Sequence, residues 1–161
     1  MSLQVSADSI REWLRTVPDP EIPHVSVVDM GMIGEIKVSD SQVSVELIPT
    51  FAGCPAIKLL QSQIQTLLRE RGLEAKVEVR YDRPWRVEDM SPAGWQALRR
   101  AGFAIPKKLS PDPSEMLSEV SCPRCGSEAV SLSSPFGPTA CRAIFRCHSC
   151  GEAFELFKPP L

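Results

Sequence analysis

Two Cys-x-x-Cys-Gly motifs near the end of the chain have the clearest spacing for metal chemistry. The first contains Cys122 and Cys125, and the second contains Cys147 and Cys150. A turn of this length lets two thiolates converge on one ion, and the glycine that follows permits the positive φ that the turn needs. Two such turns complete a tetrahedral site of four cysteines. The spacing therefore predicts a closed, structural metal site in a small ribbon.

The identity of the metal follows less directly from these residues. Zinc suits a closed four-cysteine site and brings no redox chemistry, whereas iron fits the same tetrahedral geometry and unmetallated thiols are the remaining alternative. His148 lies between two of the ligands and could replace one of them. Its spacing favours an exposed histidine that binds no metal, so we expect structural zinc held by cysteines alone.

Two further cysteines lie outside these motifs. Cys54 precedes Pro55 at the predicted start of a helix, where first-turn N–H groups and the helix dipole would favour a thiolate, and hence a soft-metal ligand or a nucleophile. The alternative is a buried cysteine between helix and sheet. For Cys141 the alternatives are a small buried residue in a strand and a transient metal or sulfur ligand.

Three carboxylates, Asp19, Glu21 and Asp29, lie on a proline-stiffened loop before the first predicted strand. If this loop folds over Cys54, they would form a shallow polar site together with Thr50. Carboxylates in such loops also serve as caps and turn anchors, and this alternative stays open. The sequence shows neither a serine-histidine-aspartate arrangement nor a phosphate-binding glycine loop.

Hydrophobic periodicity predicts the elements that position these residues. They are a helix over residues 6–16, strands over 36–38 and 43–47, a helix over 55–71, a strand over 77–81 and a helix over 91–102. Ser9 and Glu12 are spaced as a capping box for the first helix, and a short loop joins the first two strands as a hairpin.

The order of elements predicts an α+β protein with a compact α-β-β-α-β-α domain over residues 1–105. Residues 106–119 are rich in proline and poor in apolar periodicity, which is typical of a linker. Residues 120–161 are too few to build an adequate apolar core without a metal, so we expect a four-cysteine zinc ribbon there.

Composition and charge narrow the class of protein. Of the 161 residues, 43% are hydrophobic, which is ordinary for a globular chain, and the net charge is −2 without any basic block. A role in nucleic-acid binding is therefore disfavoured. No stretch is apolar enough to span a membrane, and no signal peptide is evident, so we expect a cytoplasmic protein with reduced thiols.

Three segments of the first domain resemble the SufT-like family of metal–sulfur cluster assembly domains. They are Asp19-Pro20-Glu21-Ile22-Pro23, Val28-Asp29-Met30-Gly31-Met32-Ile33 and Thr50-Phe51-Ala52-Gly53-Cys54-Pro55. The resemblance covers about residues 6–79. It implies that Cys54 is the functional position and that Thr50, Asp19, Glu21 and Asp29 form its setting.

Further segments extend the resemblance over nearly the whole chain, to the PaaD or PaaJ type of accessory subunit of the phenylacetyl-CoA epoxidase system. They are Asp82-Arg83-Pro84-Trp85, Met90-Ser91-Pro92 and Phe136-Gly137-Pro138-Thr139-Ala140-Cys141-Arg142-Ala143, followed by Phe145-Arg146-Cys147. The resemblance implies an accessory or maturation factor in aerobic phenylacetate degradation, with the oxygenase and reductase components as partners.

One thiol cannot hold a stable iron–sulfur cluster, which normally needs about four. We therefore expect Cys54 to hold iron or a cluster only transiently, with further ligands from a client or a second copy of the chain in a possible homodimer, and we expect no catalytic residues. Cys141 remains a secondary candidate ligand. The alternatives are a structural component of the oxygenase complex and a nucleic-acid-binding zinc ribbon.

Overall fold

The computed structural model describes residues 5–107, 110 and 112–158. Its contacts divide the chain into two compact units, Met1–Trp85 and Arg86–Leu161. No helix among the described residues is both long and apolar enough to cross a bilayer. The order of elements predicted from the sequence is confirmed, with a short 3-10 helix and a further α-helix added to it.

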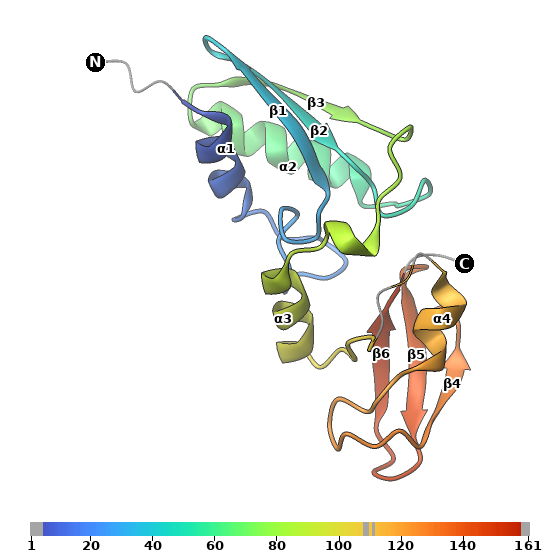
Figure 1. Cartoon of the computed structure of the whole chain (residues 1–161). Coiled ribbons are helices and arrows are strands. Elements are labelled where there is room, and N and C mark those ends of the chain that lie inside the picture. The colour runs from blue at the N-terminus through green and yellow to red at the C-terminus, as the bar shows by residue number, and fades with distance from the viewer. Residues whose placement is uncertain (1–4, 108–109, 111, 159–161) are drawn as a thin grey trace. The chain divides into compact units, whose positions relative to one another are not determined.

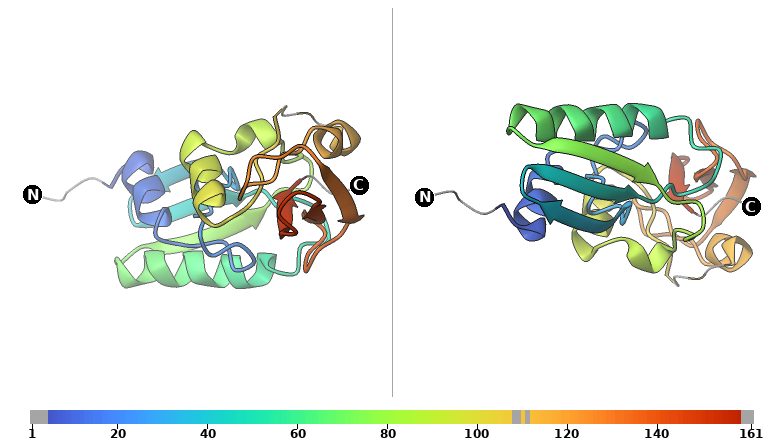
Figure 2. Two further views of the ribbon diagram at one scale, coloured as in Figure 1. Left: turned by 90° about the horizontal axis from the view of Figure 1, so that it is seen from below. Right: turned by 90° about the horizontal axis from the view of Figure 1, so that it is seen from above.

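The first unit is a three-stranded sheet with two helices on one face (Figures 1 and 2). Its elements are α1 (Ala7–Leu14), β1 (Ile33–Ser39), β2 (Gln42–Leu47), α2 (Ile57–Glu70) and β3 (Glu74–Val79). The strand order is β1-β2-β3, with β1 antiparallel and β3 parallel to β2. Alternation along β2 buries Val43, Val45 and Leu47 under the helices and leaves the other face polar.

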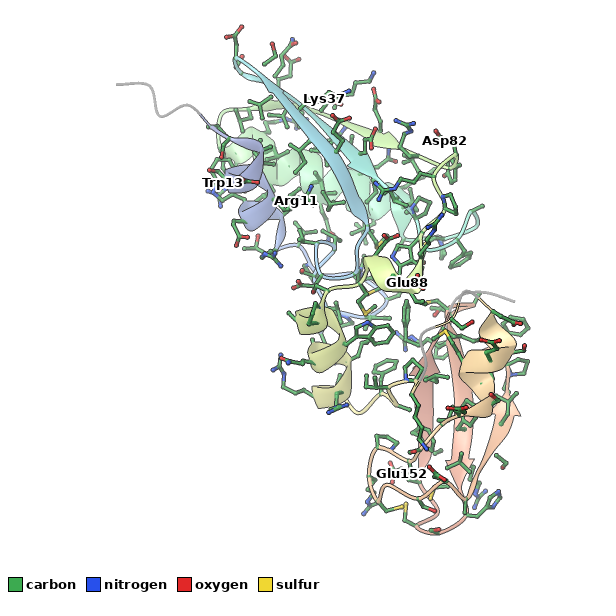
Figure 3. All side chains as sticks on the ribbon, in the orientation of Figure 1. Arg11, Trp13, Lys37, Asp82, Glu88 and Glu152 are labelled. Carbon is green, nitrogen blue, oxygen red and sulfur yellow. The ribbon has the colours of Figure 1, made fainter. Side chains whose placement is uncertain are left out.

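Helix α1 begins one residue after Ser6, whose hydroxyl accepts the N–H of Ser9 at 3.1 Å. The predicted capping box of Ser9 and Glu12 is therefore wrong, because the cap lies one turn earlier and Glu12 instead binds Arg15. Arg11 donates to two carbonyls of β1 and so links the helix to the sheet. Figure 3 labels Arg11 on α1 and Lys37 on the polar side of the sheet.

The hairpin between β1 and β2 has the short loop that the sequence predicts, with Ser39 paired to Gln42 and Asp40 at a φ of 53°. Strand β3 ends two residues before Tyr81, which is 61% exposed. The predicted extension of this strand to Tyr81 is wrong, because β2 ends at Leu47, which pairs with Val79 and whose carbonyl accepts the N–H of Arg80, so no residue of β2 is left to pair with Tyr81.

The second unit contains an antiparallel sheet in the order β4-β5-β6. Its elements are η1 (Val87–Asp89), α3 (Pro92–Arg100), α4 (Pro113–Ser118), β4 (Val130–Ser134), β5 (Arg142–Cys147) and β6 (Ala153–Phe157). Ser91 caps α3 by accepting the N–H of Gly94, as Ser-Pro at a helix start predicts. The helix α4 was not predicted from the sequence.

Residues 86–105, which the sequence assigned to the first domain, group with the ribbon in the structure. The N–H of Ala104 donates to the carbonyl of Glu155 at 2.8 Å, and the Trp95 ring meets the Phe157 ring edge-on at 6.3 Å. Within the segment expected to be a linker, Met116 on α4 is 1% exposed. Ala104 belongs to the core cluster of the small sheet, and Leu117 of α4 packs against that cluster, so both segments contribute to this core.

Candidate functional site

Four cysteines from two turns come together in the second unit. Cys122 and Cys125 lie before β4, Cys147 ends β5 and Cys150 lies before β6. Their four Sγ atoms all lie within 4.8 Å of one another. The spacing of the two motifs thus brings all four predicted ligands to one point, where thiolates can bind a metal ion.

The size of this cluster fits a tetrahedral ion. The Sγ atoms of Cys122 and Cys150 are 3.8 Å apart, and those of Cys125 and Cys147 are 3.6 Å apart. Four sulfur ligands about 2.3 Å from a tetrahedral zinc ion lie about 3.8 Å from one another. The donor set is therefore already shaped for an ion of this kind, and iron has the same geometric requirement.

Each turn has the backbone that metal-binding knuckles require. Gly126 donates its N–H to the carbonyl of Cys122 at 2.9 Å, and Gly151 donates to Cys147 at 3.0 Å. Both glycines have positive φ, 75° and 79°, as predicted from their position after each cysteine pair. A side chain at either position would strain the turn that aims the thiols.

Backbone donors also favour deprotonation within the cluster. The N–H of Cys150, followed by that of Ser149, lowers the pKa of the Cys147 thiol. Beside the ligands, Arg124 forms an ion pair with Glu152 at 2.6 Å, which raises the pKa of the guanidinium. The N–H of Ser127 acts to lower the pKa of Cys125, but the neighbouring Cys147 thiol and burial outweigh it and raise the pKa of Cys125 to about 12. The backbone donors therefore favour the thiolate at Cys147, ahead of Cys125.

His148 has interactions of its own, separate from the four ligands. Its Nε2 forms a 2.8 Å hydrogen bond with the hydroxyl of Ser131, and its backbone N–H donates to the carbonyl of Ala129. The side chain is exposed, and the cluster of candidate ligands among the described residues consists of the four cysteines. The ring therefore links the second knuckle to β4.

Cys54 lies in the loop between β2 and α2 and is half-buried. Its N–H donates to the carbonyl of Phe51, and its own carbonyl accepts from Ile57. The N-cap of α2 is Ala56, so the prediction that Cys54 lies at or beside the N-cap is wrong: the chain makes one more turn before the helix begins.

Thr50 lies in the same loop as Cys54 and is also half-buried. The segment from Thr50 to Cys54 folds back on itself through the Phe51 contact. Thr50 and Cys54 are therefore held on one short segment.

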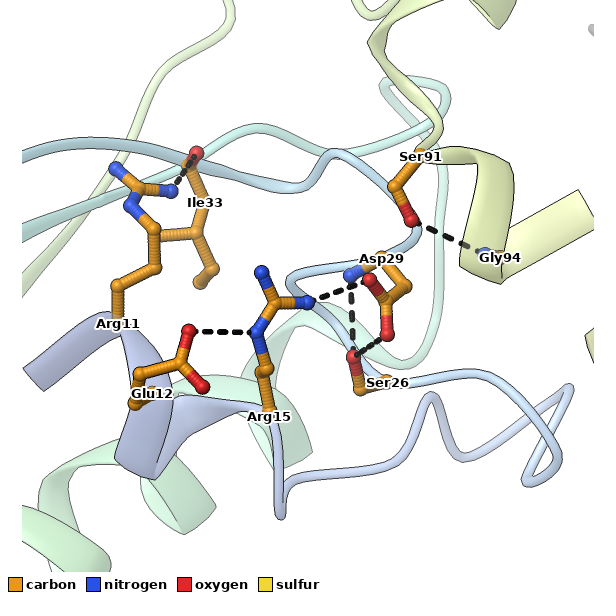
Figure 4. Close-up of polar contacts among 8 residues, drawn as sticks. All are labelled: Arg11, Glu12, Arg15, Ser26, Asp29, Ile33, Ser91 and Gly94. Atoms are coloured by element: carbon orange, nitrogen blue, oxygen red, sulfur yellow. Dashed lines mark hydrogen bonds and ion pairs between the residues drawn. The ribbon is translucent and has the colours of Figure 1, made fainter. Parts of the chain in front are cut away.

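Two of the predicted carboxylates anchor turns. Asp19 is 6% exposed and accepts the N–H groups of Glu21 and Ile22 at 2.8 and 3.1 Å. Asp29 accepts from Arg15 at 2.6 Å and from the hydroxyl of Ser26 at 3.0 Å (Figure 4). Both side chains therefore hold their own loop, as the alternative interpretation of the sequence predicted. Glu21 is half-buried in the turn that Asp19 closes.

Cys141 is 3% exposed and precedes β5 by one residue. Its Sγ lies 3.0 Å from the hydroxyl of Thr139. Sequence reasoning did not predict the burial of its neighbour Lys158, which is fully buried and donates to the carbonyl of Ala140 at 3.0 Å. Burial lowers the pKa of Lys158, while the nearby charge of Cys141 acts in the opposite direction. Nothing in its sequence context marks this lysine as buried.

Comparison with known families describes each part of the chain. Residues 7–80 match the family described as "Iron-sulfur cluster assembly protein", and residues 107–158 match the "PaaD zinc beta ribbon domain". The protein thus combines an assembly-type domain with a zinc-ribbon domain. A relative from Escherichia coli (strain K12), described as a putative 1,2-phenylacetyl-CoA epoxidase subunit, is 36% identical over 90% of this chain and 88% of its own length. The chain belongs to this PaaD family of phenylacetyl-CoA epoxidase subunits.

Solved structures resemble the assembly-type part. A DUF59 domain from Bacillus anthracis has a TM-score of 0.53 and 25% identity, over 56% of this chain and 89% of its own. A conserved hypothetical protein from Thermotoga maritima has a TM-score of 0.52 and 27% identity, over 64% of this chain and all of its own. Both similarities agree with the fold of α1 to β3.

Proposed function

We propose that this protein is an accessory factor that assists iron or iron–sulfur cluster assembly in a phenylacetyl-CoA epoxidase system and does not itself catalyse the epoxidation. The observation that carries the proposal is the pairing of an assembly-type domain with a four-cysteine ribbon in a chain of the PaaD family. The oxygenase and reductase components of that system are the proposed partners.

Cys54 is the proposed ligand for the transferred iron or cluster. It is the single cysteine among residues 1–85, and a stable cluster normally needs about four thiolates. The remaining ligands must come from a client or from a second copy of the chain. Such shared ligation makes the bound state transient, which suits delivery rather than storage.

Asp19 and Asp29 have structural roles in the loop that precedes β1. Because Asp19 and Asp29 already accept hydrogen bonds from their own turns, we assign them to shaping the loop and not to binding the metal cargo. Thr50 is the nearest polar candidate in sequence, with its side chain in the same half-buried loop as Cys54. Glu21 is a candidate carboxylate for the cargo, as the family resemblance implies.

The four-cysteine cluster is proposed to hold zinc in a structural role. Its four protein ligands fill a tetrahedral site, so no position is left for a substrate or a transferred group. Cys122 and Cys147 are part of the ribbon core, which ties metal binding to folding. The ribbon would then present a rigid surface to the epoxidase components, whereas Cys141 serves as core packing.

The experiment that tests the proposal is co-expression of the oxygenase and reductase components with and without this protein. We expect the purified oxygenase to contain less iron and to consume less phenylacetyl-CoA without it. Cys54→Ser should reproduce that loss, and Cys141→Ser is the matched control that should not. Equal iron content in all four samples would contradict the proposal.

A structural role in the epoxidase complex is the second candidate, favoured by the description of the relative as a subunit. It predicts that this protein remains bound to the oxygenase at fixed stoichiometry through size-exclusion chromatography. An assembly factor should instead dissociate once the client is loaded with iron. A nucleic-acid role ranks lower because the net charge is −2.

A further inference from the structure

The second unit contains a cavity of about 430 Å³ whose polar lining is dominated by arginines. Arg99 comes from the last turn of α3, Arg124 from the first cysteine knuckle and Arg142 from β5. Glu152 and Glu155 also line it. Figure 3 labels Glu152 near the end of the ribbon. We call this feature the arginine cavity.

The charges of the arginine cavity leave one cation unpaired. Arg124 pairs with Glu152 at 2.6 Å, and Arg142 pairs with Glu155 at 3.0 Å. Arg99 is exposed and has no ion pair or hydrogen bond within the described part of the chain. Three guanidinium groups against two carboxylates leave a net charge of +1 in the lining. Arg99 is thus the cation of the lining that lacks a carboxylate partner among the described residues, and it is the group that a ligand carboxylate would meet.

The remaining walls are apolar and fixed. Phe103 and Phe154, 8% and 5% exposed, line the cavity together with Pro123. The guanidinium of Arg142 lies 5.5 Å from the Phe103 ring centre while it pairs with Glu155, so this arginine is held from two sides. The cavity can therefore accept an apolar group next to an anion without first rearranging.

We propose that the arginine cavity docks an acidic side chain of a partner protein, with an apolar residue of that partner lying against Phe103 and Phe154. A guanidinium with all its donors available binds a carboxylate well and can do so through two hydrogen bonds. Polyphosphates and nucleic acids fit poorly, because Glu152 and Glu155 would repel every charge beyond the first. The proposal rests on the proposed function only for the identity of that partner, the oxygenase component.

The first test is an NMR titration of the full, metal-loaded chain with the dipeptide acetyl-Glu-Phe-amide. We expect backbone signals of residues 101–103 and 153–155 to shift with weak affinity, in the millimolar range that a fragment this small allows. Acetyl-Gln-Phe-amide should bind about tenfold more weakly, because it lacks the charge. Equal shifts with both peptides, or tighter binding of inorganic pyrophosphate at the same signals, would overturn the proposal.

Arg99 and its neighbour Arg100 provide a matched pair of variants. Both are exposed residues in the last turn of α3, but only Arg99 lines the cavity. Arg99→Glu should weaken binding of the Glu peptide by about tenfold or more, whereas Arg100→Glu, with the same net charge, should stay within about twofold of the wild type. An equal loss in both variants would indicate only long-range charge and would refute the assigned site.

The second test uses the purified oxygenase component immobilised on a biosensor. Arg99→Glu should bind it about tenfold more weakly than Arg100→Glu does. Cys54→Ser should bind like the wild type while failing to restore iron. If both arginine variants bind alike, the cavity proposal fails even where iron loading persists. If the peptide data hold but the wild type loads no iron, the maturation function fails and the cavity stands.

Discussion

The sheet β1-β2-β3 and the sheet β4-β5-β6 each have three strands, but different types of residue form the core beside each sheet. In the first unit, α1 and α2 supply large aliphatic side chains such as Leu14, Leu60 and Ile64, all fully buried. In the second unit, two of the predicted metal ligands, Cys122 and Cys147, belong to the core cluster itself. The first sheet can therefore be stabilised by apolar burial, whereas we expect the second to depend on a metal as well.

The cysteines of the two units differ in the same way. Cys122 and Cys147 are buried and have thiol neighbours at 3.8 and 3.6 Å, so their ligand set is complete within the chain. Cys54 is half-buried in a loop and lies in a unit with no second cysteine. From this comparison we expect the closed ligand set to serve folding, and we expect Cys54 to depend on another molecule for further ligands.

Loss of one metal ligand should have the largest effect on folding. Cys125→Ser should release the metal and unfold the ribbon, because structural zinc contributes on the order of 10 kcal/mol to the folding of such small domains. Metal analysis by mass spectrometry and amide NMR spectra measure the two outcomes, and signals of residues 7–80 should persist. Ser127→Ala is the control, because it removes the hydrogen bonds of the Ser127 hydroxyl with Ser149 and with the N–H of Ala129 but no thiol. A metal-free ribbon that keeps its dispersed signals would break the comparison.

Truncation of an apolar side chain in the first unit should destabilise that unit and leave the ribbon and its metal unaffected. Leu60→Ala on α2 should lower the free energy of unfolding of the first unit by about 3 kcal/mol and leave the metal content unchanged. Leu59→Ala is the matched control, because Leu59 is 50% exposed, and it should cost less than about 0.5 kcal/mol. Urea denaturation followed by circular dichroism gives both values. Loss of metal from the Leu60 variant would show that the units are not independent in stability.

Replacement of Lys158 tests whether its buried charge destabilises the second unit. Lys158→Met should raise the free energy of unfolding by about 1 kcal/mol at neutral pH, because the methionine keeps the volume without a buried ammonium. Burial lowers the pKa of Lys158 in the folded state below its ordinary value of 10.5, so the unfolded state binds the extra proton. The free energy of unfolding of the wild type should therefore increase as pH rises toward 10.5, and the advantage of the variant should become smaller. A difference that widens with pH would contradict this account.

Local signals in the sequence predicted the elements whose causes are local. The cap of α3 at Ser91, the hairpin turn at Asp40 and both glycines after the cysteine pairs follow from residue types at fixed spacing. The end of β3 was missed because it depends on where β2 stops, which the alternating pattern through Tyr81 does not show.

The limits at the site have the same physical origin. The four ribbon ligands could be predicted because their spacing fixes the turns that carry them. The extra turn between Cys54 and Ala56, the burial of Lys158 and the contact of Ala104 with β6 arise from tertiary packing. Pro55 gave a plausible helix start, but proline also fits the turn that precedes one.

Replacement of Cys54 should have the smallest effect on folding and the sharpest effect on function. Cys54→Ser keeps the size of the side chain in a half-buried loop, so the free energy of unfolding should change by less than about 0.5 kcal/mol, with metal content intact. Serine is a poor ligand for soft metals, so iron delivery to the oxygenase should fail.

Because α2 begins at Ile57, three residues after Cys54, we expect the partner or the bound metal, rather than the first turn of α2, to favour the thiolate. Alkylation with iodoacetamide distinguishes the two: we expect client binding to change the rate at Cys54, with Cys54→Ser as the blank. A rate that is high in the isolated protein and unchanged by the client would show that this chain itself activates the thiol. Cys54 would then not depend on another molecule, and the contrast with the four ribbon cysteines would be wrong.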